Sequence, residues 1–425
     1  MHAKRHLARN EMKIGLLAYH SACNFGATLQ LLSTYMYLRK SHHDPIVINW
    51  TPSDFEYDCL LHTPQEQYAC QKTVREQFWK ETELCRTAEE IAQVIEKEKI
   101  EAVIIGSDAV AQHHPLLERI AFPCRTIIAI NKHTSDRTFP NSFWGIWQDH
   151  LSHPIPMALM SASCQDSSYK QIPAKTRREM EKRIMRFDYL SVRDSWTRDM
   201  MSFLTHEERR PDITPDPVFA FNQNASELVP SRQETLQKFQ LPENYILLSF
   251  LNKHKPSVSQ EWLDEFRHLA QADHITCVML PFSNGKSFGK ASRSIDLPLT
   301  PVDWFALIKY SSGYVGNNMH PIIASMLNHV PFFSFDTYGT SHITNIWAND
   351  QSSKIKHILT SAGFSDYRAS DITYFSEVPH AADVYEKLKT FDHAKSDAFT
   401  QEYLDKYNRM MNDILQTFTR IISTK

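Results

Sequence analysis

Short apolar segments of strand length recur along the chain and alternate with segments of helical periodicity. Several of them are apolar at consecutive positions, as at residues 103–105 and 246–248, which is typical of parallel strands buried on both faces. Strands of this kind alternating with helices predict an α/β protein with mostly parallel sheets. The predicted strands cover residues 13–19, 46–50, 102–106, 126–130, 157–162, 189–193, 245–251, 275–280, 313–316 and 331–335.

Amphipathic spacing and capping residues predict the helices between these strands. Thr87 is followed by Glu90, a pairing that favours a capping box at a helix start. Thr300 precedes Pro301, which combines a cap residue with a proline in the first helical turn. The predicted helices cover residues 27–39, 87–99, 174–186, 195–204, 259–270 and 301–310.

A polar stretch divides these elements into two strand-and-helix series. Residues 222–242 contain two prolines and lie between the two series, and the last part of the chain is helical without strands. We therefore expect two α/β domains with a cleft between them and a C-terminal helix that packs back across them. The predicted parts are a loose N-terminal extension (1–11), a first domain (12–225), a linker (226–242), a second domain (243–375) and C-terminal helices (376–425).

Composition and charge exclude several functional classes. The chain has 10 glycines in 425 residues, and their positions form neither G-x-G-x-x-G nor G-x-x-x-x-G-K. The standard dinucleotide fingerprint and the P-loop are therefore both absent. The formal net charge of −3 provides no general basic field for nucleic acid. No apolar stretch approaches the ~20 residues that cross a bilayer.

Cysteine and histidine usage narrows the setting further. The seven cysteines are scattered without a C-x-x-C pair, and the 21 histidines include no H-E-x-x-H. This usage favours a reducing cytoplasm and predicts neither a disulfide framework nor a metal site. The basic N-terminal residues precede an apolar run that is short and broken by Lys13, so a secretory signal is a poor fit.

Polar loops follow several predicted strands, at the strand ends where α/β folds bind ligands. Asn24 and Gly26 lie between a strand and a helix, where free N–H groups could accept an anion, although ordinary turn chemistry uses the same residues. A second strand ends in Gly106, Ser107 and Asp108. Asp108 could act as an acid or base, bind a hydroxyl group, or cap the next helix.

Two later loops carry a cation and a histidine. Arg193 ends a predicted strand and suits bidentate capture of a carboxylate or phosphate, or a structural pair with a carboxylate such as Asp216. His320 precedes Pro321, and because proline favours the first helical position, we expect His320 to be the N-cap beside amides that suit an anion. Histidine also suits proton transfer near pH 7; a plain capping role is the alternative.

Taken in order, these segments resemble the polysaccharide pyruvyl transferase family over about residues 12 to 340. Each motif is short, and the resemblance depends on their common order and spacing. The matching features are Lys13-Ile-Gly-Leu-Leu, Asn24-Phe-Gly26, Ile105-Gly-Ser-Asp108, Ser191-Val-Arg-Asp194, Asp216-Pro-Val, and His320 followed later by Pro331-Phe-Phe.

The resemblance implies a fold and a reaction. The fold is that of GT-B glycosyltransferases, with two Rossmann-like domains of mostly parallel sheets and the site in the interdomain cleft. The implied donor is phosphoenolpyruvate, used without a cofactor. The implied acceptor is a sugar of a surface polysaccharide or of its lipid-linked precursor, on which a pyruvate ketal forms as phosphate is released. The net charge predicts no nucleic-acid partner, and a peripheral membrane contact and a homo-oligomer stay open.

The resemblance also suggests roles for individual residues. His320 corresponds to the catalytic histidine, Asp108 is an acid/base candidate, and Arg193 corresponds to an anchor for the donor's carboxylate or phosphate. The other expected substrate-binding residues are Asn318, Met319, Asn24, Gly26 and Ser107.

The chain departs from the family pattern on both sides of His320 and after Asp108, where an aromatic residue usual in the family is missing. Many relatives carry arginine where this chain has Asn318, and glycine where it has Pro321. Two alternatives therefore stay open. One is a GT-B glycosyltransferase that uses a nucleotide sugar and binds its ribose through an acidic residue of the second domain. The other is a relative that binds glycan or phosphate without turnover.

Overall fold

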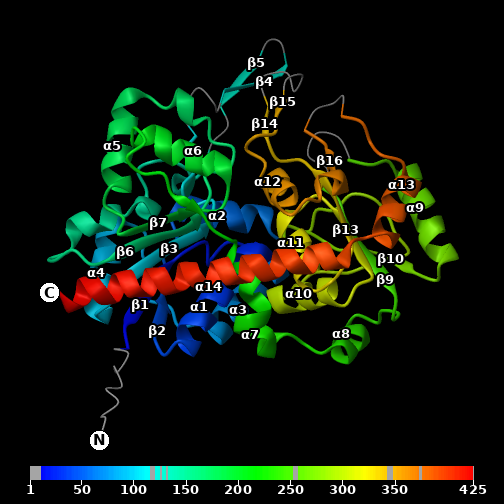
Figure 1. The fold of residues 1–425 in the computed structure, drawn as a ribbon, viewed down its shortest axis with the longest axis horizontal. Helices are drawn as coiled ribbons and strands as arrows, with labels where there is room; N and C mark the ends of the chain where they lie inside the picture. The colour runs from blue at the N-terminus through cyan, green and yellow to red at the C-terminus, as the bar shows by residue number, and fades with distance from the viewer. Residues whose placement is uncertain are drawn as a thin grey trace, which may run out of the picture.

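Two six-stranded sheets, each built of parallel strands, form the centres of two α/β domains that lie side by side (Figure 1). The structure is a computed structural model. It describes residues 11–114, 120–124, 127–130, 133–251, 257–341, 348–372 and 376–424.

The first sheet has the strand order β2-β1-β3-β6-β7-β8, and all its neighbouring strands are parallel. The strand order reverses between β1 and β3, which is the position where open α/β sheets bind ligands. The strands are β1 (Lys13–Leu17), β2 (Asp44–Val47), β3 (Ala102–Asp108), β6 (Met157–Ala162), β7 (Tyr189–Val192) and β8 (Asp212–Ile213).

The second sheet has the order β11-β10-β9-β12-β13-β16, again with parallel neighbours. This is the Rossmann strand order, and its reversal lies between β9 and β12. The strands are β9 (Tyr245–Ser249), β10 (Thr276–Met279), β11 (Arg293–Ser294), β12 (Gly313–Gly316), β13 (Phe332–Asp336) and β16 (Arg368–Ser370).

Helices flank both sheets, and two of their caps, at Thr87 and Thr300, are those that the sequence predicts. The Thr87 side chain accepts from the Glu90 amide in a capping box, and the Thr300 side chain accepts from the Asp303 amide. The helices are α1 (Phe25–Lys40), α2 (Ser53–His62), α3 (Gln65–Phe78), α4 (Ala88–Glu98), α5 (Ala174–Ile184), α6 (Ser195–Leu204), α7 (Phe221–Ala225), α8 (Arg232–Lys238), α9 (Gln260–Ala272), α10 (Pro301–Lys309), α11 (Met319–Leu327), α12 (Lys354–Ser361), α13 (Ala381–Lys389) and α14 (His393–Ser423).

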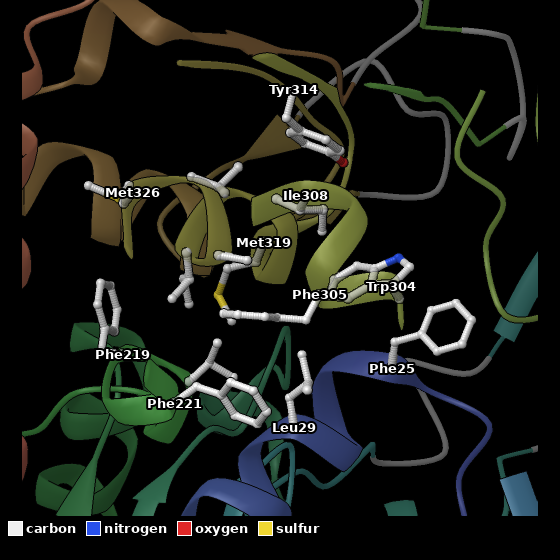
Figure 2. Close-up of a cluster of buried hydrophobic side chains, with 14 of the residues drawn as sticks. Phe25, Leu29, Phe219, Phe221, Trp304, Phe305, Ile308, Tyr314, Met319 and Met326 are labelled. Carbon is white, nitrogen blue, oxygen red and sulfur yellow. The ribbon is translucent and has the colours of Figure 1, made fainter. Parts of the chain in front are cut away.

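An apolar core joins the two domains (Figure 2). Phe25 of α1 packs against Trp304 of α10 with ring centroids 5.5 Å apart. Phe221 of α7 packs against Phe305 of α10 at 4.6 Å. Burying such rings is strongly favourable, so these contacts hold α10 of the second domain against α1 and α7 of the first.

The C-terminal helix α14 crosses from the second domain to the first (Figure 1). Phe399 and Tyr403 pack on Phe219, which lies in the short helix Pro217–Ala220 of the first domain. Further along α14, Tyr407 accepts a hydrogen bond from the Asn224 amide group at 3.3 Å. Helix α14 therefore contacts both domains, and its contact with the first domain includes the short helix 217–220.

Some elements differ from the predictions. Residues 127–130 form strand β5, but it pairs antiparallel with β4 (Ile120–Cys124) outside the two main sheets. Only two residues separate these strands, a spacing that favours local antiparallel pairing. The expected linker contains α8, which begins with a capping box of Ser231 and Glu234. Helices α2, α3 and α12 were not predicted, whereas α13 and α14 are the expected C-terminal helices.

Candidate active site

The ligand-binding ends of the two sheets meet across the domain interface. Asn24 and Gly26, which follow β1, and Asn318 and His320, which follow β12, line one pocket of about 170 Å³. Residues 281–284, which follow β10, form part of its wall. This volume is below the roughly 300–1,000 Å³ typical of sites for drug-sized ligands, so the pocket suits a small molecule.

Asn24 is the N-cap of α1. Its side-chain oxygen accepts hydrogen bonds from the amides of Gly26 and Ala27 at 3.0 and 3.3 Å. These two amides, which the sequence offers as anion donors, therefore already have an acceptor. Gly26 has a second role, because a Cβ atom at this position would lie 2.0 Å from Nδ1 of His320. Only glycine leaves room for the imidazole ring here.

His320 is not the N-cap of its helix, contrary to the sequence prediction. Helix α11 begins at Met319 with Asn318 as its N-cap, so His320 is the second helical residue and Pro321 the third. The prediction fails because proline is tolerated throughout the first turn, where backbone amides have no intrahelical acceptor. The His320 residue is 8% exposed and Nδ1 lies at the Gly26 wall of the pocket.

The other ring nitrogen of His320 lies against a buried carboxylate. Nε2 is 3.5 Å from Oδ2 of Asp216 and forms no hydrogen bond with any residue that the structure describes. Asp216 also accepts hydrogen bonds from the Gln30 side chain and from the Val218 amide. A carboxylate held in this way can orient an imidazole and stabilise its protonated form.

Arg193 joins Asp216 to Asp108 in a buried ion-pair network. Its Nη1 is 3.0 Å from Oδ2 of Asp216, and its Nη2 is 2.8 Å from Oδ1 of Asp108. The Arg193 side chain is 2% exposed, and both of its terminal nitrogens face carboxylates. The structural pair with Asp216, one of two alternatives left open by the sequence, is thus present, and Asp108 adds a second one.

The electrostatics of this network favour its charged state. Burial alone would raise the pKa of Asp216, but His320, Arg193 and the Val218 amide hold that pKa well below its ordinary value. Burial would also raise the pKa of Asp108, whereas the charges of Arg193, Lys354 and His320 lower it overall. The two carboxylates in turn raise the pKa of Arg193 in spite of its burial. Asp108 and Asp216 are therefore ionised at neutral pH.

The remaining predicted residues divide between the pocket and the core. Asn318 lines the pocket, and its Oδ1 is 3.5 Å from the hydroxyl oxygen of Tyr338. The Met319 side chain instead lies among the apolar residues between the domains (Figure 2). Ser107 is buried, and its hydroxyl has no hydrogen-bond partner among the described residues.

Sequence reasoning did not find several residues at this site. Asp216 was predicted as a possible partner for Arg193 and as part of a family motif, but its position beside His320 depends on how the domains pack. Tyr338 and Lys354 were not among the candidate site residues, because no motif in the sequence includes them. Residues 282–284 follow β10 but carry no motif that marks them as pocket residues.

Metal ligands and membrane spans were also sought in the described residues. No group of three or more His, Cys, Asp or Glu side chains is placed there to hold a metal ion. In the same part of the chain, no helix is both long enough and apolar enough to cross a membrane.

Solved structures share this architecture. UDP-GlcNAc 2-epimerase from Neisseria meningitidis, bound to UDP-GlcNAc, matches with a TM-score of 0.53 and 11% identity, over 96% of this chain and 100% of that one. A putative UDP-N-acetylglucosamine 2-epimerase from Listeria monocytogenes matches with a TM-score of 0.51 and 10% identity, over 97% of each chain. At such identities the likeness shows the fold alone, and it confirms a protein of the GT-B class, with two Rossmann-like domains.

Family comparison identifies the particular group within this class. Residues 24–338 match the family described as polysaccharide pyruvyl transferase. Because the match covers most of the chain, the protein belongs to this family, as the sequence motifs predict. A search of curated proteins finds no match.

Proposed function

We propose that the protein transfers the enolpyruvyl group of phosphoenolpyruvate to a sugar of a surface polysaccharide or its precursor. Two sugar hydroxyls become bonded to C2 of the pyruvyl group, and phosphate leaves. Membership of the polysaccharide pyruvyl transferase family supports this reaction. The observation that carries the proposal is the placement of His320, backed by Asp216, in a small pocket between the domains.

The reaction needs one group that both gives and takes protons. Protonated His320 donates a proton from Nδ1 to the methylene carbon of the donor, and C2 becomes an oxocarbenium-like centre. A sugar hydroxyl attacks C2 and its proton passes to the neutral imidazole. The second hydroxyl then attacks C2 and displaces phosphate by cleavage of the C2–O bond, and its proton passes to the leaving phosphate. Asp216 lies on the Nε2 side of the ring, where its charge stabilises the imidazolium.

In the proposed mechanism, Nδ1 is the reactive nitrogen. Nε2 faces Asp216 in the interior, whereas Nδ1 lies beside Gly26 at the pocket wall. In the neutral ring, a proton on Nε2 directed at Asp216 leaves the Nδ1 lone pair available to accept a proton. In this proposal, the charge of Asp216 favours the tautomer with the proton on Nε2, which the proton transfers at Nδ1 require.

Replacement of His320 tests the proposal. We expect His320→Ala to lower phosphate release from phosphoenolpyruvate at least ~10²–10⁴-fold, the usual contribution of a general acid–base group. The measurement uses the full chain with a panel of hexosides and N-acetylhexosaminides as acceptors. His268→Ala is the matched control, because His268 is an exposed histidine on α9 of the same domain.

The outcomes separate the proposal from its alternatives. Unchanged turnover in His320→Ala would remove His320 from the catalytic role. A folded wild type that consumes no phosphoenolpyruvate with any acceptor would overturn the proposed reaction. Consumption of a nucleotide sugar in its place would favour a glycosyltransferase, and thermal stabilisation by ligand without product would favour a relative that only binds.

A further inference from the structure

Lys354 is a buried cation that lies beside the candidate active site. It is the first residue of α12 in the second domain, and it is 8% exposed. Its Nζ lies 4.6 Å from the centroid of the Tyr338 ring, and the Tyr338 hydroxyl oxygen lies 3.5 Å from Oδ1 of Asn318. Because Asn318 lines the pocket, the Tyr338 ring connects the ammonium group to the second-domain wall of the pocket.

The charged groups around Lys354 lie on several elements at the interface between the two domains. Arg193 repels its charge, and three carboxylates attract it. Yet within the described part of the chain, Nζ forms neither a hydrogen bond nor an ion pair with any of these carboxylates, and Asp108 and Asp216 are paired with Arg193 instead. The surrounding charged and titratable groups are Asp108 of β3, Arg193 after β7, Asp194 at the N-cap of α6, Asp216, His320 of α11 and Tyr338 after β13.

Three features of this position disfavour a positive charge. Burial removes the ammonium group from water, and Arg193 adds a like charge. The N-terminus of α12 adds the positive end of a helix dipole. Burial and Arg193 together lower the pKa of Lys354 to about 8, although Asp108, Asp216 and Asp194 oppose this shift. A lysine that served only the fold would gain from a direct carboxylate partner, which Lys354 lacks among the described residues.

An anion that enters the site from solution would supply the missing counter-charge. Arg193 is less suited to this task, because both of its terminal nitrogens already contact carboxylates. A lysine ammonium is a compact point charge with three donors, and this chemistry suits phosphate. Lys354 is also on the second-domain side of the interface, as are Asn318 and His320 of the pocket.

We infer that Lys354 binds the phosphate group of the donor, and that Arg193 is a positioning residue that holds Asp108 and Asp216 in place. The identity of the donor as phosphoenolpyruvate rests on the proposed function, whereas the phosphate site does not. Lys354 lies outside all the sequence motifs that predicted site residues.

Binding measurements on the full chain test this assignment. Calorimetry at pH 7 with phosphoenolpyruvate and with inorganic phosphate compares the wild type with Lys354→Met and Lys354→Arg. We expect Lys354→Met to raise the Kd for both ligands at least tenfold. Lys356→Met is the matched control on the same helix, because Lys356 pairs with Asp350 and should leave both Kd values unchanged.

The pH dependence separates a charge effect from a structural one. Because the Lys354 pKa is about 8, the wild type should lose most of its phosphate affinity between pH 7 and 9.5, as the ammonium loses its proton. Lys354→Arg should keep its affinity over this range, since arginine stays protonated. Lys354→Met should bind weakly at both pH values. A melting temperature at or above that of the wild type would show that this variant is folded.

Each contrary outcome has a definite meaning. Equal affinity of wild type and Lys354→Met for phosphate, or a wild type that binds neither probe, would overturn the assignment. If Lys354→Met lost affinity for phosphoenolpyruvate but not for inorganic phosphate, the contact would be with the carboxylate, and this would overturn the assignment as well. Turnover of phosphoenolpyruvate with binding independent of Lys354 would contradict only this inference. Phosphate binding that depends on Lys354, without such turnover, would contradict only the proposed function.

Discussion

The two sides of the interdomain site differ in how their charges are balanced. On the first-domain side, Arg193 lies between Asp108 and Asp216, and each charge has a direct partner. On the second-domain side, Lys354 has no such partner among the described residues. The charges on the first-domain side therefore neutralise one another, whereas the second-domain side keeps a cation that can bind a ligand.

This difference matches the roles that we propose for the two domains. A network in which both carboxylates contact one guanidinium is rigid and can hold Asp216 behind His320. A buried ammonium without a carboxylate partner is costly to the fold and is useful only when an anion arrives. The first domain thus orients the proton-transfer group, and the second carries the groups that would meet the donor.

Removing Arg193 should give the largest effect on stability. Arg193→Met leaves Asp108 and Asp216 buried without a counter-charge, and breaking such a buried pair costs about 3–5 kcal/mol. Lys354→Met is the control from the other wall, and it should leave the melting temperature unchanged or raise it. Thermal or urea unfolding of the two variants measures the contrast. Equal destabilisation by both substitutions would show that the two walls do not differ.

A smaller effect should follow from a methyl group added at Gly26. Alanine is favoured over glycine in a helix, but here its Cβ would overlap the imidazole of His320, so the ring must move. Because a displacement of about 1 Å can cost roughly 10²-fold in rate, we expect Gly26→Ala to lower kcat by about that factor without unfolding the protein. The measurement is phosphate release together with circular dichroism.

Gly313→Ala is the control for this substitution. Its Cβ would approach side-chain carbon atoms of Ile246 and Leu388 at 3.3 Å, in the core of the second domain. We expect a small change in stability and an unchanged kcat. Full activity in Gly26→Ala would show that contact with Gly26 does not set the position of His320.

Local signals in the sequence predict much of the fold. The capping pairs at Thr87 and Thr300 have the hydrogen bonds that their spacing implies. Apolar runs such as residues 245–251 locate the buried strands, because both faces of a parallel sheet are covered. Where a tolerated residue was taken as a fixed signal, as with Pro321, the helix start was misplaced by two residues.

The arrangement of the site needed tertiary information. Asp108 ends strand β3 and Arg193 follows strand β7, and because β6 separates these strands, the contact between the two residues depends on the strand order of the sheet. Met319 is adjacent to His320 in the sequence, yet it packs between the domains, because successive helical residues point about 100° apart. The charged groups around Lys354 are brought to it by the packing of the two domains, and no local sequence pattern marks this lysine.

The fate of the donor's methylene group tests the central claim most directly. The full-length wild type is incubated in D₂O with ¹³C-labelled phosphoenolpyruvate and the acceptor panel, and the products are examined by ¹³C NMR. The proposed proton transfer predicts a ketal whose methyl group carries one deuterium, formed together with an equal amount of phosphate. A product that keeps the enol methylene, or phosphate release without a labelled sugar, would contradict the proposal.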